Sequence, residues 1–166
     1  MIILGIDPGL AIVGWGVIEY SNSKIKTIAY GAIETPAHTP TEDRLLLIYE
    51  GMRELIATYK PDDVAVEELF FNTNTTTAIR VAEARGVILM AARKHGVSIS
   101  EYTPLQVKQA VVGYGRAEKK QVINMVTMLL GLDKPPRPDD TADALAIALC
   151  HAHSGASRLA RYYNQK

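Results

Sequence analysis

Short runs of apolar residues, each ended by a turn signal, recur along the chain and predict a sheet of five strands. The first three runs are separated only by Pro8-Gly9 and by residues 21–23, so we expect an antiparallel meander. The two later runs alternate with long helical patterns, which favour parallel strands. The predicted strands are Ile2–Asp7, Ile12–Tyr20, Ile25–Glu34, Val64–Val66 and Val97–Tyr102.

Apolar residues at helical spacing, bounded by capping residues and by Pro or Gly, predict five helices. We expect Thr39 to cap the first, Thr103 with Gln106 to cap the third, and Asp139 or Asp140 to cap the last. The polar, Asn- and Thr-rich segment 69–77 indicates a loop. The predicted helices span 40–60, 78–95, 104–112, 116–130 and the segment from the acidic pair to residue 150.

Together these elements indicate an α/β fold, in which helices cover both faces of a mixed sheet. The length of 166 residues suits one compact domain with a buried core. We place this domain at residues 1–153, followed by a polar C-terminal tail at 154–166.

Composition excludes several classes of protein. No apolar run reaches the roughly 18 residues that a membrane span needs. The N-terminus lacks a basic segment and reaches Asp7 early, unlike a secretory signal peptide. Cys150 is the only cysteine, which rules out an internal disulfide and a cysteine zinc site. We therefore expect a cytoplasmic protein with no membrane contact.

A net charge of zero conceals an uneven distribution of charge along the chain. Residues 1–70 hold 5 Lys or Arg against 11 Asp or Glu, whereas residues 71–137 hold 10 against 4. This asymmetry fits a phosphate-binding surface beside an acidic, cation-binding cluster. Unrelated solvated surfaces would give the same counts, so the charges alone leave both interpretations open.

Four acidic residues are candidates for a metal centre. Asp7 and Glu67 each follow an apolar strand, and buried carboxylates are costly unless they share a cation. Asp140 and Asp143 are three apart and share one face of a helix that alternating alanines keep slim. Strands one and four can be neighbours, which would bring the acids together. Such oxygen donors select Mg²⁺ or Mn²⁺, and two ions about 4 Å apart can drive phosphodiester hydrolysis.

Each acid also has a plain structural interpretation. Asp7 before Pro-Gly fits a turn former, and Glu67 fits a solvated charge at a strand end. Asp140 and Asp143 fit acids that stabilise a helix N-terminus. The metal interpretation gains weight only because separate acidic points fall on the same predicted edge of the sheet.

Six segments occur in a fixed order between residue 1 and about residue 153: Gly5–Gly9, Val66–Phe71, Ala84–Gly86, Gln106–Gly115, Ala117–Lys119 and Asp140–Ala148. Together they resemble the RuvC family of Holliday junction resolvases. The resemblance implies an RNase H-like fold and a homodimer. It also implies paired, Mg²⁺-dependent nicks that leave 5′-phosphate and 3′-hydroxyl ends, in recombination and DNA repair. It implies two Mg²⁺ per subunit, replaceable by Mn²⁺, and a branch-migration motor of the RuvA–RuvB type as partner.

The same resemblance assigns roles by position. Asp7, Glu67 and Asp140 match the catalytic acids, and Asp143 matches the fourth metal ligand. The candidate DNA-binding residues are Phe70, Asn74, Arg80, Lys108 and Lys119. The lysines would neutralise phosphate, and an exposed aromatic after Glu67 would stack on bases at an opened junction. Surface lysines and a core phenylalanine at the strand end are the plain alternatives.

Three competing functions remain at this stage. An ATP-binding domain of the actin and sugar-kinase class also places an Asp and a Gly after its first strand, but it needs a second lobe. A non-catalytic junction-binding protein would keep the fold without the chemistry. A nuclease of the same fold acting on another branched structure, or on RNA, is the third.

Overall fold

A mixed five-stranded sheet forms the centre of the protein in the computed structural model, which describes residues 1–69 and 75–154. The strand order is β3-β2-β1-β4-β5, with β1 antiparallel to β2, β2 antiparallel to β3, and β4 parallel to both β1 and β5. The predicted meander and the predicted pairing of strands one and four are both confirmed. The strands are β1 (Ile2–Asp7), β2 (Ile12–Ser21), β3 (Lys24–Glu34), β4 (Asp63–Glu67) and β5 (Ser98–Tyr102).

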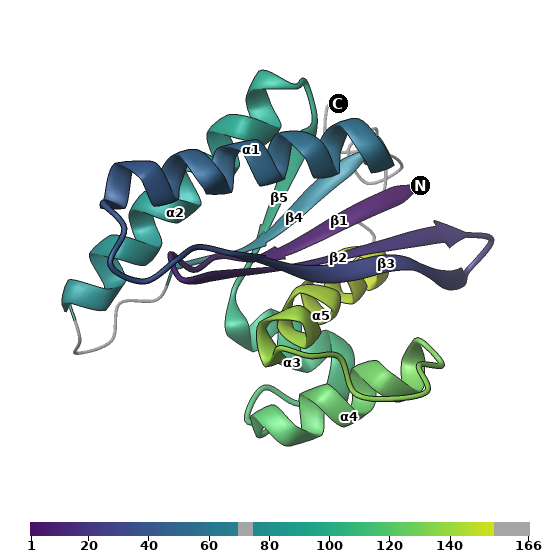
Figure 1. Cartoon of the computed structure of the whole chain (residues 1–166). Coiled ribbons are helices and arrows are strands. Elements are labelled where there is room, and N and C mark those ends of the chain that lie inside the picture. Colours follow the sequence, from purple (N-terminus) through teal and green to yellow (C-terminus); the bar gives the residue numbers. More distant parts are fainter. Residues whose placement is uncertain (70–74, 155–166) are drawn as a thin grey trace, which may run out of the picture.

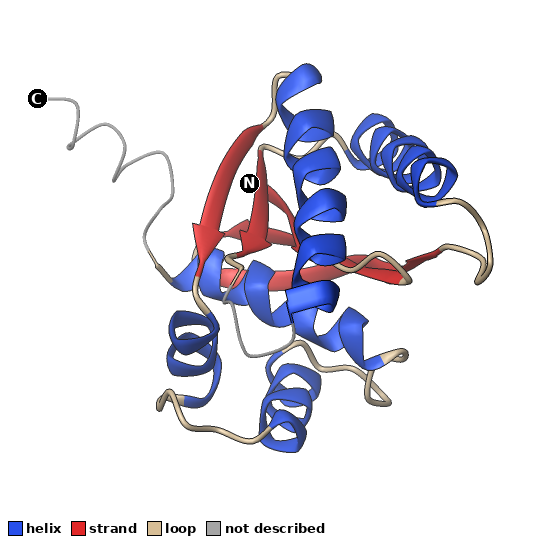
Figure 2. Ribbon diagram, turned by 90° about the vertical axis from the view of Figure 1, so that its left-hand side faces the viewer, coloured by secondary structure: helices blue, strands red, loops and turns tan. Residues whose placement is uncertain are grey.

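Helices cover both faces of this sheet, as predicted (Figure 1). On one face lie α1 (Thr41–Tyr59) and α2 (Thr75–Lys94); on the other lie α5 (Asp139–His153), α3 (Pro104–Val112) and α4 (Lys119–Leu129). The view turned by 90° in Figure 2 shows the same arrangement, with the strands between two groups of helices. None of the helices in the described ranges is long and apolar enough to cross a membrane.

The side chains of β1 point alternately to the two faces of the sheet, and the buried residues on these faces form two clusters. Ile3 packs into the cluster beneath α3, α4 and α5, whereas Leu4 and Ile6 pack into the cluster beneath α1 and α2. Successive side chains of a strand point to opposite faces, so Asp7 continues the row of Ile3 and faces α5. The position of Asp7 in β1 therefore places the site in the layer of α3, α4 and α5.

Helix α5 lies against the sheet because the residues at the contact are small. A Cβ at Gly5 would overlap the carbonyl oxygen of Ala144 and come within 2.9 Å of Ala148 Cβ. A Cβ at Gly14 would overlap the carbonyl oxygen of Asp140. The predicted slim alanine helix is thus confirmed, and the glycines of β1 and β2 complete the contact.

Several predicted helix ends are wrong. Pro40, not Thr39, is the N-cap of α1, and Pro138 precedes α5, so neither Asp139 nor Asp140 caps it. The cause is the same at both sites: the extended backbone of the proline already ends the preceding segment, and the helix starts directly after it.

Two other helices begin elsewhere than predicted. Helix α2 starts at Thr75, inside the segment predicted as a loop, and α4 starts at Lys119, after a capping box formed by Glu118 and Gln121. Helix α5 continues to His153, past the predicted residue 150. The capping box of Thr103 and Gln106 at α3 is confirmed.

Candidate active site

Two parallel strands place the first pair of acids at one edge of the sheet. Asp7 is the last residue of β1 and Glu67 is the last residue of β4. The register pairs Ile6 with Val66, so the two acids that follow them lie side by side. Both Ile6 and Val66 are fully buried on the α1 side, which leaves Asp7 and Glu67 on the α5 side.

Helix α5 brings the second pair of acids to the same edge. Asp140 and Asp143 occupy its first turns, one turn apart. The close contact of Gly14 with the Asp140 carbonyl holds this end of the helix against β2. The electrostatic effect of Asp143, Glu67 and Asp140 on Asp7 shows that the four carboxylates share one neighbourhood. The three segments therefore carry their acids to one region of the structure.

The environment of these acids disfavours their charged forms. Burial, and then the negative charges of Asp143, Glu67 and Asp140, hold the pKa of Asp7 well above its ordinary value. Burial, with the charge of Asp143, raises the pKa of Glu67 to about 7. Burial also raises the pKa of Asp143, although Lys119 opposes that shift. Carboxylates whose charged forms are disfavoured in this way are typical of sites that bind a cation.

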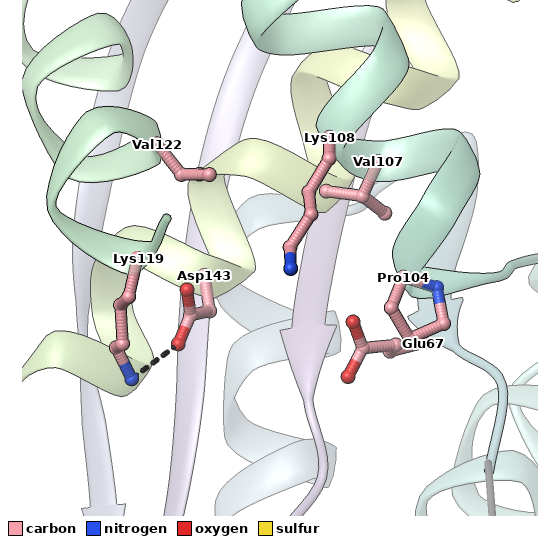
Figure 3. A pocket seen from close by; sticks show the side chains of 7 residues that line it. All are labelled: Glu67, Pro104, Val107, Lys108, Lys119, Val122 and Asp143. Carbon is pink, nitrogen blue, oxygen red and sulfur yellow. Dashed lines mark ion pairs between the residues drawn. The ribbon is translucent and has the colours of Figure 1, made fainter. Parts of the chain in front are cut away.

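Two lysines from the layer of α3 and α4 complete the site. A pocket of about 190 Å³ is bounded by Glu67, Asp143, Lys108 of α3 and Lys119 of α4. Lys119 Nζ lies 2.8 Å from an Asp143 carboxylate oxygen, and Lys108 points toward the space between Glu67 and Asp143 (Figure 3). Burial alone would lower the pKa of Lys119, but its hydrogen bond to Asp143 and the nearby acids raise it. Both lysines therefore lie at the acidic centre.

The donor set suits a hard divalent cation. Asp7, Glu67, Asp140 and Asp143 offer only oxygen ligands, and a divalent ion would relieve the repulsion that raises the pKa of Asp7. Within the described residues, no three acidic, His or Cys side chains are gathered closely enough to form a metal-binding group. Asp143 is engaged by Lys119 instead.

A second pocket lies beyond Asp140, on the side of α1 and α2. Arg80, predicted to bind DNA, lines this pocket together with Arg44. Sequence reasoning missed Arg44, because it follows Glu42 and Asp43 in an amphipathic helix and no motif marks it. The predicted roles of Phe70 and Asn74 concern positions outside the described residues.

Comparisons with known proteins show the family of this chain. Residues 3–151 match the family described as crossover junction endodeoxyribonuclease RuvC. A protein of that description from Alkaliphilus metalliredigens is 63% identical over 155 residues, which cover 93% of this chain and 94% of the relative. Its counterpart in Clostridioides difficile is 62% identical over 154 residues, 93% of this chain and 91% of the relative.

Solved structures give the same result. The structure titled "T. thermophilus RuvC in complex with Holliday junction substrate" matches with a TM-score of 0.87 and 40% identity, over 93% of this chain and 94% of that one. The yeast mitochondrial Holliday junction resolvase Ydc2 matches with a TM-score of 0.66 at 16% identity, over 98% of this chain and 83% of that one. The latter likeness concerns the fold alone. The expected RNase H-like fold is confirmed, and the chain belongs to the RuvC family of crossover junction endodeoxyribonucleases.

Proposed function

We propose that this protein resolves four-way Holliday junctions in recombination and DNA repair by nicking two opposed strands, with Asp7, Glu67, Asp140 and Asp143 holding divalent ions. The observation that carries the proposal is the convergence of these carboxylates, from β1, β4 and α5, beside Lys108 and Lys119. Family membership supports the reaction, and the relative solved with a Holliday junction supports the substrate. The nuclease domain would span 1–153.

The reaction is hydrolysis of one phosphodiester bond on each of two strands. A water oxygen adds to phosphorus, the bond from phosphorus to the 3′ oxygen breaks, and the products are a 5′-phosphate and a 3′-hydroxyl. Two Mg²⁺ ions, or Mn²⁺ in their place, would supply an activated water and stabilise charge on the phosphate. Asp7, Glu67 and Asp140 are the catalytic acids of this proposal, and Asp143 is the fourth ligand.

The lysines act on the phosphate. The ammonium of Lys108 lies in the space between Glu67 and Asp143, where it would stabilise negative charge that develops on the phosphate. In the absence of substrate, the ion pair with Lys119 neutralises the charge of Asp143. Once Asp143 is a metal ligand, the ammonium of Lys119 is left to a DNA phosphate.

A homodimer would match the near two-fold symmetry of a junction, since two like sites then meet two like strands. Helix α2 supports this proposal. Ile79 and Met90 are 59% and 53% exposed, and the space around Gly86 between them is open. The three residues share one helix face, where a glycine permits a second backbone to approach. Cooperation with a RuvA–RuvB type motor and a cytoplasmic location are proposed from the family alone.

A cleavage assay on a labelled four-way junction, with a linear duplex as control, tests the function. We expect symmetric paired nicks with Mg²⁺, none in EDTA, and no cutting of the duplex. Asp7→Asn should bind the junction and fail to cut it, whereas Asp133→Asn, at an exposed acid that lines neither pocket, should cut normally. Binding without cutting by the parent protein, at several Mg²⁺ and Mn²⁺ concentrations, would favour the non-catalytic alternative. Tight ATP binding in place of junction binding would favour the kinase class.

A further inference from the structure

The pocket beyond Asp140, here called the Arg44 pocket, has a volume of about 350 Å³. It shares no lining residue with the pocket of Lys108 and Lys119, but Asp140 and Asp143, which line one each, are a single helical turn apart. The two pockets therefore meet α5 at adjacent turns of the helix. Its lining residues are Gly9, Leu10, Ala11, Ile12, Arg44, Arg80, Val81 and Asp140.

Arg44 is fixed in this pocket by a buried threonine. Its Nε donates to Thr35 Oγ1 at 2.7 Å, and that hydroxyl donates to the Leu10 carbonyl oxygen at 2.6 Å. Thr35 is only 8% exposed, and its backbone N–H donates to the Ala11 carbonyl oxygen at 3.0 Å. This chain of hydrogen bonds links α1 to the loop that follows Asp7. It uses one nitrogen of the guanidinium, and no other residue in the described ranges bonds to the two terminal nitrogens, which can serve a ligand.

The charges of the pocket call for an anion. No carboxylate in the described part of the chain lies at ion-pair distance from Arg44 or Arg80. Two guanidinium groups against the single carboxylate of Asp140 leave one positive charge, which matches one phosphodiester group. A guanidinium whose Nε is already held offers its terminal N–H groups to phosphate without a further loss of side-chain freedom.

We propose that the Arg44 pocket binds a backbone phosphate of the cleaved DNA strand, next to the phosphate that is cut. Arg44 is the phosphate-binding residue, joined by Arg80, and Thr35 is a positioning residue that acts through Arg44. The inference rests on the proposed function, because the scissile phosphate must lie at the acids for its neighbour to reach this pocket. Its role is to set the register of the strand at the acidic centre, not to supply chemistry.

Salt dependence of junction binding separates a phosphate contact from a purely structural role. In EDTA, Arg44→Ala should weaken binding about tenfold and lower the slope of log K against log salt by about one. Arg53→Ala, on the same helix and paired with Glu50, is the matched control and should change neither. Arg44→Lys and Thr35→Val keep the charge but lose the hydrogen-bond anchor, so the slope should stay while cleavage slows or shifts position. These two variants also serve if Arg44→Ala fails to fold.

Neutral methylphosphonates, placed one at a time along the cleaved strand, locate the phosphate. We expect one position beside the cut to weaken binding by the parent protein but not to weaken binding by Arg44→Ala further. Binding of inorganic phosphate in the pocket at millimolar concentration, with no effect of any methylphosphonate on junction binding, would assign the pocket to a free anion and overturn the proposal. So would an unchanged salt slope in a folded Arg44→Ala. Cleavage of the same junctions by the parent protein with Mg²⁺ tests the proposed function separately, since that function fails only if the junction is not cut.

Discussion

At the scale of single residues, the acidic centre costs the protein stability when no cation is bound. Burial and mutual repulsion hold the pKa of Asp7 well above its ordinary value, and burial raises the pKa of Glu67 to about 7. A folded-state pKa above the unfolded value means that the folded protein holds more protons. The stability that these groups contribute is therefore fully present below their unfolded-state pKa values. It is lost as pH rises through their folded-state pKa values.

Removing the charge of Asp7 should therefore stabilise the metal-free protein. In EDTA at pH 8 we expect Asp7→Asn to melt above the parent protein, by about 2–4 °C for each 1 kcal/mol gained. The difference should narrow toward pH 5, because a raised pKa favours protonation of the parent Asp7 as pH falls. Thermal melts at both pH values measure it. Asp133→Asn is the control, because Asp133 is exposed and its charge is not among the causes of the shifted pKa values of Asp7 and Glu67. Equal melting of Asp7→Asn and parent protein at pH 8 would contradict the argument.

At the scale of secondary-structure elements, the position of α5 against β1 and β2 sets the geometry of the site. Gly14 touches the backbone of Asp140, so any side chain there must move the helix end that carries two of the acids. We expect Gly14→Ala to reduce cleavage by at least tenfold while junction binding in EDTA changes much less, because a small displacement disturbs catalysis more than binding. Cleavage rates and binding curves test this. Ser21→Ala, at the exposed far end of the same strand, should leave both unchanged.

A buried polar contact joins the other end of α5 to β5. Tyr102 Oη lies 2.8 Å from His151 Nδ1, and neither residue is exposed by more than 6%. Tyr102→Phe removes this hydrogen bond without altering the ring, so we expect a loss of about 1–3 kcal/mol in the free energy of unfolding. Urea unfolding measures the loss. Tyr114→Phe, at a tyrosine that is 45% exposed, is the matched control and should cost almost nothing.

The elements show where sequence reasoning succeeds and where it fails. The box of Thr103 and Gln106 was predictable because all its partners lie within four residues. The start of α2 was not, since threonines have weak helix propensity and a helix can extend through them when tertiary structure supports it. The closeness of Asp7 and Glu67 was predictable because each follows an apolar strand, and the pairing of β1 with β4 joins those strand ends. Arg44 was not, because its role depends on Thr35 and the loop after β1, contacts that a single sequence does not display.

At the scale of the whole molecule, the sheet separates two kinds of surface. The acidic centre and its lysines belong to the side of α3, α4 and α5, and the proposed dimer face lies on α2 of the opposite side (Figure 1). Two copies joined through α2 would each keep an open acidic centre. Paired cutting then requires both that the copies associate and that neither site is covered by the association.

A charge placed on the α2 face should therefore allow one strand to be cut but prevent the paired cutting of two strands. We expect Met90→Glu to convert a two-chain particle into a one-chain particle in sedimentation, because two carboxylates would be buried against each other at the interface. On a supercoiled plasmid with a cruciform, the parent protein should linearise the circle and Met90→Glu should accumulate nicked circles. Met128→Glu adds the same charge on α4, where Met128 is 67% exposed, and should behave as the parent protein. If Met90→Glu remains a two-chain particle, the interface does not lie on α2. If the parent protein linearises the plasmid as a single chain, paired cutting does not need a dimer.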